Sequence, residues 1–427
     1  MTSERLERPA EAFVWVWLPG AVDPVVAGRL AAERGAYVYN YGRSYLERPD
    51  AIALYWPELP LRRGAIAPPP PLTIAGCLRD GAPDAWGRRV IVNRLTGLAG
   101  EAAGRVDFDE LTFLLHSGSD RAGALDFQAS SDAYRPRDAV GAPLEALLDA
   151  AGRVERGEPV PPDLDRALFH GSSIGGARPK ALVTDGSRKL IAKFSARNDF
   201  YPVVKAEFLA MRLAARAGLA VAPVELVEAA GKDVLLVERF DRALTAPGWT
   251  RRAMVSALTM LGLDEMQARY ASYGDLADRI RAGFTAPRET LRELFARLVF
   301  NVLAGNTDDH ARNHAAFWDG AVLSLTPAYD LCPQARTGRE ANQAMLIDGR
   351  DRRSRLETCR SAAPRFLLKD AEACAIIDAQ VQAIREEWEA ACDEARLSRV
   401  ERTFFWRRQF LNDYAFEDYA GGAAAAV

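Results

Sequence analysis

Short apolar runs and segments with helical spacing alternate through the first third of the chain. Residues 13–17 read Phe-Val-Trp-Val-Trp, a run typical of a strand. Asp84 directly behind Pro83 is a typical helix start. The predicted elements of this region are strands at 13–17, 36–41, 51–55 and 122–128 and helices at 84–95 and 108–116. This mixture predicts a small N-terminal α+β domain over residues 1–135.

The next stretch, residues 136–165, is rich in Pro, Gly and charged residues and predicts a linker. One amphipathic segment lies inside it, marked by Leu144, Leu147 and Leu148.

A different pattern begins near residue 180. Two apolar runs flank Asp185-Gly186, which predicts a β-hairpin. A helix is predicted at 203–217 and two further strands at 222–229 and 233–239. The order β-β-α-β-β resembles in outline the small lobe of a protein kinase, which we place at 166–245.

The last part of the chain is mostly helical in pattern. Residues 290–304 carry one apolar stripe, and a hairpin is predicted around Trp318-Asp319-Gly320. Residues 364–411 predict further helices. These features predict a helical lobe over 246–415, followed by a disordered tail over 416–427.

Composition narrows the class of protein. The 427 residues carry 26% charged side chains and a net charge of −3, so the chain presents no overall basic field for nucleic acid. Five cysteines without a C-x-x-C pair argue against structural zinc and a disulfide framework. No run has the length of a signal peptide or membrane span, so we expect a cytoplasmic protein with no membrane partner.

Candidate chemistry begins with the segment Asn306-Thr307-Asp308-Asp309-His310-Ala311-Arg312-Asn313. Asp308 and Asn313 have the spacing of the Asp and Asn in a protein-kinase catalytic loop, directly after the long helix. An Asx-rich turn capping that helix is an alternative interpretation. Metal ligation by His310 and His314 is another, but no third ligand lies nearby in the sequence.

Three more residues complete a phosphoryl-transfer set. Asp330 follows a predicted hairpin, where kinases place a magnesium-binding carboxylate. Lys193 ends a strand, and Glu207 in the next helix is its expected partner. An ordinary turn aspartate and a solvated lysine are the simpler alternatives for Asp330 and Lys193.

Two segments are candidates for holding the nucleotide. Residues 172–180 contain Gly175-Gly176, whose amides can form an anion-binding nest, although the segment matches no standard phosphate-loop motif. Residues 234–241 run from an apolar strand into a polar end, as in an adenine-binding hinge.

Taken together, these segments resemble the HipA family of bacterial toxin kinases over nearly the full chain. The C-terminal matches are Ser173-x-x-Gly176-Ala177-x-x-Lys180, Val237-Glu238-Arg239-Phe240-Asp241, Thr307-Asp308-x-His310-Ala311-x-Asn313 and Leu325-Thr326-Pro327-x-Tyr329-Asp330. The N-terminal matches are Leu61-x-Arg63-Gly64, Ala82-Pro83-Asp84 leading into Arg88, and Gly118-x-Asp120-x-x-Gly123-Ala124.

The resemblance implies a bilobal protein-kinase-like α+β fold and a serine/threonine kinase that uses ATP and Mg²⁺. It implies Asp308 as the catalytic carboxylate, Asn313 and Asp330 as magnesium ligands, and Ser173 as an autophosphorylation site that switches the kinase off. The residues implied in ATP binding are Lys193, Lys180, Gly175, Gly176, Ala177, Glu207, Glu238, Phe240, Asp241 and His310.

The resemblance also implies partners. These are a small helix-turn-helix antitoxin (HipB-like), DNA only indirectly through it, and a protein substrate such as an aminoacyl-tRNA synthetase. The sequence departs from the family pattern in two places: Asp309 stands where Gly is common, and Arg178-Pro179 replaces a more common polar pair, with Pro179 stiffening the loop. A small-molecule or lipid kinase and a catalytically inactive repressor partner are alternative functions.

Overall fold

The N-terminal domain is built on a four-stranded antiparallel sheet of order β3-β2-β1-β4. The computed structural model describes residues 8–98, 106, 108–137, 141–158, 160–161, 164, 168, 176–336 and 338–422. The elements of this domain are β1 (Glu11–Val16), β2 (Val25–Glu33), β3 (Ala36–Tyr41), α1 (Arg43–Leu46), α2 (Gly76–Arg79), α3 (Ala85–Thr96), α5 (Glu110–Leu115) and β4 (Leu125–Gln128).

The sequence prediction was wrong about one strand and missed another in this sheet. Residues 51–55 form no strand and contribute only an isolated bridge between Tyr55 and Leu59. The missed strand is β2, which lies between β1 and β3 and contains Gly28. Glycine weakens a strand pattern, but β3 lies so close here that a Cβ on Gly28 would collide with the Asn40 carbonyl oxygen and would lie 2.6 Å from the Tyr39 hydroxyl.

A second four-stranded antiparallel sheet, of order β5-β6-β8-β7, confirms the predicted β-β-α-β-β order of the small lobe. Its elements are β5 (Lys180–Asp185), β6 (Arg188–Lys193), α8 (Val203–Arg216), β7 (Val224–Ala229) and β8 (Lys232–Glu238). A short hairpin follows, made of β9 (Arg242–Thr245) and β10 (Gly248–Arg251).

The predicted linker at 136–165 is more than a connector, because it contains helix α6 (Leu144–Arg156). Buried leucines of α6 share an apolar cluster with Trp86 of α3 and with Ala192 and Leu236 of the small-lobe sheet. The amphipathic segment around Leu147 is therefore part of the small lobe's core. A helix of this length is only marginally stable alone, so packing of its apolar stripe supplies most of its stability.

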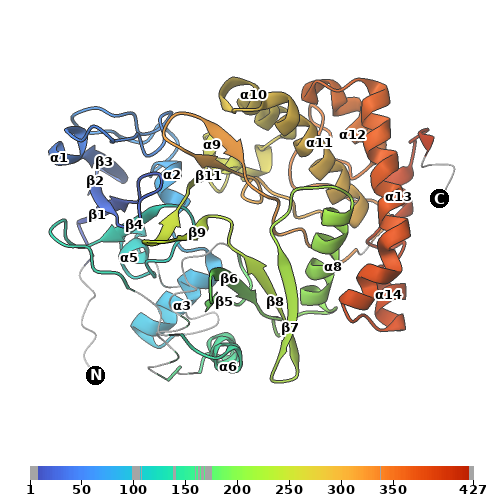
Figure 1. The fold of residues 1–427 in the computed structure, drawn as a ribbon, viewed down its shortest axis with the longest axis horizontal. Coiled ribbons are helices and arrows are strands. Elements are labelled where there is room, and N and C mark those ends of the chain that lie inside the picture. The colour runs from blue at the N-terminus through green and yellow to red at the C-terminus, as the bar shows by residue number, and fades with distance from the viewer. Residues whose placement is uncertain are drawn as a thin grey trace.

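The C-terminal lobe is mostly helical and adds a three-stranded sheet of order β11-β12-β13. Its elements are β11 (Ala253–Ser256), α9 (Ala257–Met260), η2 (Ala268–Tyr270), α10 (Tyr273–Gly283), α11 (Pro287–Ala304), β12 (Ala315–Trp318), β13 (Leu323–Leu325), α12 (Leu356–Ala362), η3 (Ala363–Phe366), α13 (Asp370–Glu394), α14 (Arg399–Phe405) and η4 (Asp413–Phe416). Helix α8 lies beside α13, so the small lobe packs against the helical lobe (Figure 1).

Residues 416–420 were predicted to belong to a disordered tail, and this was wrong. The Tyr419 side chain is buried, and its hydroxyl donates to an Asp378 carboxylate oxygen at 3.2 Å. An aromatic ring with a polar tip anchors this end to α13, which the Ala- and Gly-rich composition after Tyr419 concealed.

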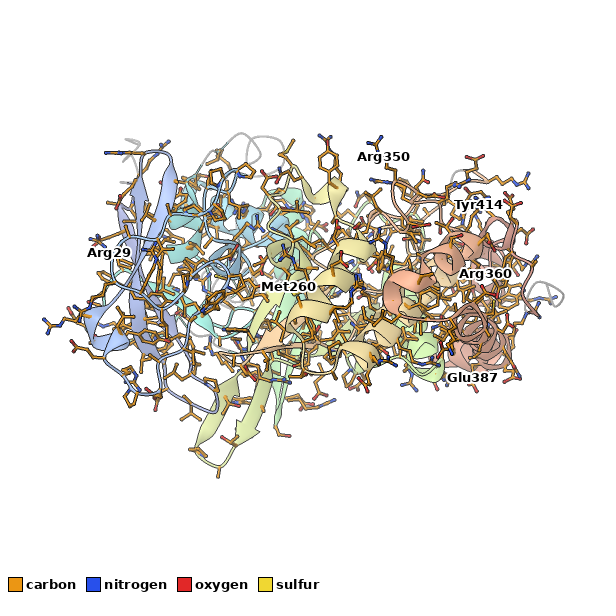
Figure 2. All side chains as sticks on the ribbon, turned by 90° about the horizontal axis from the view of Figure 1, so that it is seen from above. Arg29, Met260, Arg350, Arg360, Glu387 and Tyr414 are labelled. Atoms are coloured by element: carbon orange, nitrogen blue, oxygen red, sulfur yellow. The ribbon has the colours of Figure 1, made fainter. Side chains whose placement is uncertain are left out.

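The molecule is elongated, with the N-terminal sheet at one end and the C-terminal helices at the other. Figure 2 shows Arg29 of β2 at the first end, Met260 of α9 near the middle and Glu387 of α13 at the far end. No helix in the described ranges has both the length and the apolar character that crossing a bilayer requires.

Candidate active site

The predicted pairing of Lys193 with Glu207 is present, and Asp330 joins it. The Lys193 ammonium lies 2.5 Å from Glu207 Oε1 and 2.7 Å from Asp330 Oδ1. Strand β6 ends at Lys193, and Glu207 lies on the buried face of α8. Three segments far apart in the sequence thus bring two carboxylates to one ammonium group.

The electrostatics of these groups follow from their contacts. Burial alone would lower the pKa of Lys193, but the Asp330 and Glu207 carboxylates raise it above its usual range. Attraction by Lys193 lowers the pKa of Asp330 to about 2. Burial raises the pKa of Glu207, and Lys193 opposes this. The ammonium and the Asp330 carboxylate are therefore both charged at neutral pH.

Asp330 has a backbone conformation that L-residues rarely adopt, with φ at +59°. Aspartate tolerates the left-handed region better than most residues do. Such outliers cluster at functional sites when the surrounding structure holds them in place. Here the ion pair with Lys193 fixes the side chain.

A second lysine lies opposite Lys193 on the neighbouring strand. Lys180 of β5 is the cross-strand partner of Lys193. Its buried ammonium lies 3.2 Å from Asp84 Oδ2, at the N-cap of α3. Like charges on facing residues repel, so the carboxylates of Asp84, Glu207 and Asp330 make the lysine pair tolerable.

The predicted catalytic loop begins where α11 ends. Gly305 stops the helix with φ at +67°, and a Cβ there would lie 2.7 Å from the Gln409 carbonyl oxygen. Three residues later, Asp308 is exposed, while Asn313 is buried. The Asn313 side-chain amide donates to the Asp308 backbone oxygen at 3.3 Å, which closes the loop on itself.

The environment of Asp308 is acidic. Desolvation raises the pKa of Asp308, and the Asp330 and Asp309 carboxylates add to this, while His310 opposes it. His310 is half-buried, and its Nδ1 atom is buried without a hydrogen-bond partner in the described part of the chain. His310 lowers the pKa of both Asp308 and Asp330, and Asp330 raises that of Asp308, so the three side chains lie around the same space.

The side chain of Asp309 is buried, unlike that of Asp308. Its carboxylate is buried and accepts a hydrogen bond from the Tyr273 hydroxyl, and His314 Nε2 lies 3.0 Å from its Oδ2. The Tyr273 hydroxyl also accepts from Asn301 of α11 at 3.4 Å. Asp309 therefore fixes the loop to the lobe beneath it. His314 is engaged there too, rather than paired with His310 as a metal ligand.

The predicted hinge follows β8. Glu238 pairs with Leu190 of β6, and its backbone N–H donates to Pro223 at 2.9 Å. Phe240 packs against Phe317 and Tyr329, with ring centroids 5.8 and 5.6 Å away.

Asp241, predicted as a nucleotide-binding residue, has contacts of a different kind. Its buried carboxylate accepts from Arg239 at 3.0 and 2.9 Å, from Arg242 at 2.9 Å and from the Gly123 N–H at 2.8 Å. These contacts place the Asp241 side chain in the junction with the N-terminal domain, and its role in nucleotide binding stays a prediction.

Part of the glycine-containing loop is visible. Ser173 and Gly175 lie outside the described residues. Gly176 has φ at +116°, and a Cβ on it would collide with the Lys180 ammonium. The Ala177 carbonyl oxygen accepts from Arg89 of α3 at 2.5 Å. The end of the loop is thus packed against Lys180 and against the N-terminal domain.

The oxygen donors around this space suit a magnesium ion. Within the described residues, the ion pairs of this lysine–carboxylate cluster join three carboxylates, those of Asp84, Glu207 and Asp330, to the two ammonium groups of Lys180 and Lys193. Mg²⁺ is commonly held by one or two carboxylates together with phosphate oxygens. Asp330 and Asn313 stay the predicted ligands of such an ion.

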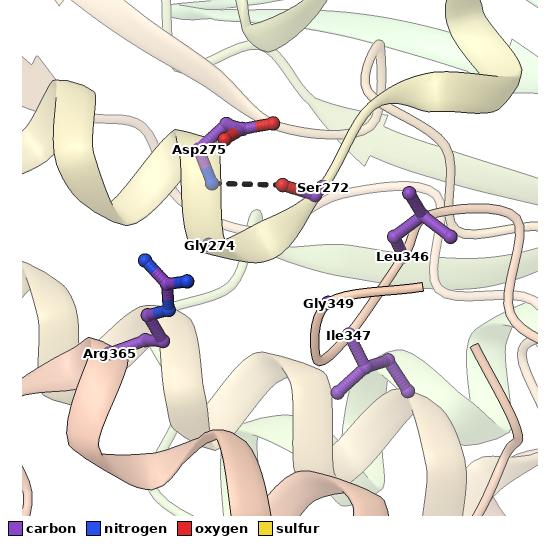
Figure 3. Close-up of a pocket in the computed structure, with 7 residues that line it drawn as sticks. All are labelled: Ser272, Gly274, Asp275, Leu346, Ile347, Gly349 and Arg365. Atoms are coloured by element: carbon purple, nitrogen blue, oxygen red, sulfur yellow. Dashed lines mark hydrogen bonds between the residues drawn. The ribbon is translucent and has the colours of Figure 1, made fainter. Parts of the chain in front are cut away.

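A separate small cavity of about 130 Å³ lies at the start of α10. Figure 3 shows Ser272 capping this helix through a 2.9 Å hydrogen bond from the Asp275 N–H, with Arg365 across the cavity. None of the predicted site residues lines it.

Several residues that shape the site were not assigned a role from sequence. Asp84 appeared only as a helix cap and Tyr273 not at all, because their partners lie 96 and 36 residues away. The resemblance of Ala82-Pro83-Asp84 and of the segment around Asp120 to family motifs was the one signal available.

Comparisons with known proteins agree with this geometry. The HipA N-terminal domain family matches residues 16–128, and the HipA-like C-terminal domain family matches residues 172–388. The chain is 30% identical over 254 residues to the Y4mE protein of Sinorhizobium fredii strain NGR234, covering 54% of this chain and 59% of that protein. It is 31% identical over 185 residues to the serine/threonine-protein kinase toxin HipA of Shewanella oneidensis strain MR-1, covering 37% of this chain and 42% of that protein. The matched segments thus span less than two thirds of either relative.

A solved structure of the Shewanella oneidensis MR-1 toxin–antitoxin complex of HipA, HipB and operator DNA has a similar fold. The TM-score is 0.62 at 20% sequence identity, covering 92% of this chain and 95% of the matched chain. Both domains, in the same order and over most of the length, are therefore accounted for by one family. The chain belongs to the HipA family.

Proposed function

We propose that this chain is an ATP- and Mg²⁺-dependent serine/threonine protein kinase. The observation that carries the proposal is the Lys193 ammonium, held at 2.5 Å by Glu207 and at 2.7 Å by Asp330. Protein kinases use a lysine paired with a helix glutamate to position phosphates, next to a metal-binding aspartate. The arrangement here has each of these groups.

The residues divide the work as follows. Lys193 and Lys180 bind the phosphates of ATP, and Asn313 and Asp330 hold the metal ion. Mg²⁺, when bound, neutralises charge on the phosphates. Asp308 accepts or orients the proton of the attacking hydroxyl, and its exposure leaves room for a protein substrate. Glu238 and Phe240 contact the adenine.

We further propose that the kinase acts as the toxin of a toxin–antitoxin pair. The matched Shewanella chain was solved with HipB and operator DNA, and we infer a similar small helix-turn-helix antitoxin for this chain. An aminoacyl-tRNA synthetase is the proposed substrate class. Autophosphorylation at Ser173 is proposed to silence the enzyme, because a phosphate adds about −1.5 to −2 charge beside a phosphate-binding loop.

The direct test is incubation of the purified protein with γ-labelled ATP and Mg²⁺. Wild type should label itself at Ser173, Asp308→Ala should lose about 10²–10⁴-fold in rate, and Asp393→Ala should match wild type. Asp393 is a suitable control because it is an exposed aspartate on α13. A wild-type protein that binds no ATP with any divalent ion would refute the proposal.

Phosphoproteomics of cells in which expression of this protein has been induced should identify the substrate. Cells that express Asp308→Ala are the matched comparison. Turnover of a soluble acceptor without any protein labelling would favour a small-molecule or lipid kinase instead. The absence of both kinds of turnover in a protein that still binds the antitoxin would favour an inactive repressor partner.

A further inference from the structure

Two N-terminal segments have no role in the chemistry described so far. One is Ala82-Pro83-Asp84 at the start of α3, and the other is residues 118–124, which precede β4. Both belong to the N-terminal domain, yet both contact the segments that surround the proposed nucleotide site.

Asp84 reaches the phosphate side of that site. Its Oδ1 caps α3 by accepting from the Gly87 N–H at 2.9 Å, and its Oδ2 lies 3.2 Å from the Lys180 ammonium. The ammonium is 2% exposed and the carboxylate 8% exposed, so water screens this pair little. One carboxylate therefore ties the helix to the buried lysine.

Neighbouring residues of α3 hold the same part of the loop. The Trp86 indole N–H donates to the Lys180 carbonyl oxygen at 3.1 Å. Arg89 donates to the Ala177 carbonyl oxygen at 2.5 Å. The backbone and the ammonium of Lys180 are thus both fixed from the N-terminal domain.

Asp120 reaches the adenine side. Its Oδ1 accepts from Arg239 at 2.8 Å and from Arg242 at 3.0 Å. The Gly123 N–H donates to Asp241 at 2.8 Å, and Arg239 also donates to the Arg121 carbonyl oxygen. These arginines flank Phe240, so the segment after β8 is held on both sides by the N-terminal domain.

We propose that Asp84 and Asp120 are positioning residues of the nucleotide site, one for its phosphate side and one for its adenine side. The N-terminal domain is then a working part of the kinase. The proposal rests on the kinase function proposed above. Its physical basis is that Asp84 contacts the buried Lys180 ammonium and Asp120 contacts the arginines on either side of Phe240, and small displacements of binding groups are costly.

The test measures nucleotide affinity in the full chain by titration calorimetry with ATP and Mg²⁺. Asp84→Asn removes the charge but keeps a good N-cap. We expect it to weaken ATP binding about 10–100-fold, the range typical when a group that orients a ligand-binding residue is lost. At saturating ATP, kcat should change less than KM.

Asp109→Asn is the matched control. Asp109 is also an N-cap aspartate of the N-terminal domain, accepting from the Thr112 N–H at 2.8 Å at the start of α5. It has the same capping role, and the hydrogen bond that it accepts lies within the N-terminal domain. Its substitution should leave ATP affinity at the wild-type value.

A second measurement separates the two sides of the site. Asp84→Asn should weaken the binding of inorganic tripolyphosphate as much as the binding of ATP. Asp120→Asn should weaken the binding of ATP and of adenosine but leave the affinity for tripolyphosphate unchanged. A general loss of structure would weaken all three ligands together and lower the melting temperature.

The outcomes are distinguishable from those of the kinase proposal. If wild type binds no ATP, the proposed function fails. If wild type binds ATP and Asp84→Asn binds it as tightly as Asp109→Asn does, the positioning role is overturned. If Asp84→Asn does not fold, Asp84→Ser, which also caps helices, replaces it in the same comparison.

Discussion

Two clusters of charge lie on either side of the small lobe, and they are built on different principles. The lysine cluster consists of Lys180, Lys193, Asp84, Glu207 and Asp330. The arginine cluster consists of Arg239, Arg242, Asp120 and Asp241, with Lys189 3.6 Å from Asp120 at its edge.

The two clusters differ in charge balance and in access. The arginine cluster has at least one cation for each carboxylate, and the side chains of Arg239 and Arg242 are 2% exposed. The lysine cluster has a carboxylate in excess, and the side chain of Asp330 is 40% exposed. A balanced, buried network holds domains together, whereas an accessible surplus of carboxylate is suited to receive a cation.

The largest expected effect comes from Asp330→Asn, which balances the lysine cluster. Asparagine tolerates the positive φ of this position, and Lys193 keeps Glu207 as a partner. We therefore expect kinase activity to fall by about 10²-fold or more, with the melting temperature close to wild type. Labelled-ATP assays and thermal unfolding on one sample measure both. Retained activity with Mg²⁺ would contradict the role given to Asp330.

The same substitution in the arginine cluster should act on stability. Asp241→Asn leaves Arg239 and Arg242 with one fewer buried carboxylate, and breaking a buried ion pair costs about 3–5 kcal/mol. Urea unfolding should show this as a lower midpoint. Asp413→Asn, at an exposed site, serves as the control. Equal midpoints for the two variants would mean that the junction is not held by charge.

Neighbouring carboxylates of the catalytic loop offer a sharper comparison. Asp309→Asn disturbs buried hydrogen bonds to Tyr273 and His314, so we expect a loss of about 1–3 kcal/mol in unfolding free energy. Asp308→Asn, at an exposed position, should leave stability unchanged and remove activity. The reversed pattern in urea unfolding and kinase assays would exchange the roles of these residues.

The arginine cluster should also weaken in acid. Burial would raise the pKa of Asp241, but Arg239 and Arg242 lower it below the unfolded value of about 3.9. A carboxylate with a depressed folded pKa stabilises the fold above the unfolded pKa, and this contribution is lost as pH falls toward the folded pKa. Between about pH 5 and pH 3, wild type should therefore lose more stability than Asp241→Asn does. Parallel urea midpoints across that range would contradict this.

The smallest effect is expected at the surface between α8 and α13. Arg212 lies 2.8 Å from Glu394, and both side chains are more than one third exposed. Exposed ion pairs contribute about 0.2–1 kcal/mol, so Arg212→Ala should shift the urea midpoint slightly, and less at high salt. A larger shift would show that this contact between the lobes depends on charge more than on packing.

Local pattern was sufficient for much of the fold. The hairpin at Asp185-Gly186, helix α8 and helix α11 follow from turn chemistry and apolar spacing within one element. Strand β2 was not predicted, and helix α6 was assigned to a linker. Both are stabilised mainly by packing against other elements. β3 lies against Gly28 of β2, and Trp86 and Leu147 share one apolar cluster although they lie far apart in the sequence.

The candidate site divides in the same way. By itself the sequence determined the chemical inventory: Lys193, Glu207, Asp308, Asn313 and Asp330, in the order of a kinase. Spacing along the chain is sufficient for Asp308 and Asn313, because the predicted catalytic loop is one continuous segment.

Only the tertiary structure decided which carboxylate faces which cation. It turned Asp309 inward to Tyr273, gave Asp241 to the arginines of the domain junction, and brought Asp84 to Lys180. The physical reason is that charge pairing acts through space at a few ångströms, while the paired residues lie anywhere along the chain. The sequence therefore identifies the charged residues, and the tertiary structure determines which of them are paired.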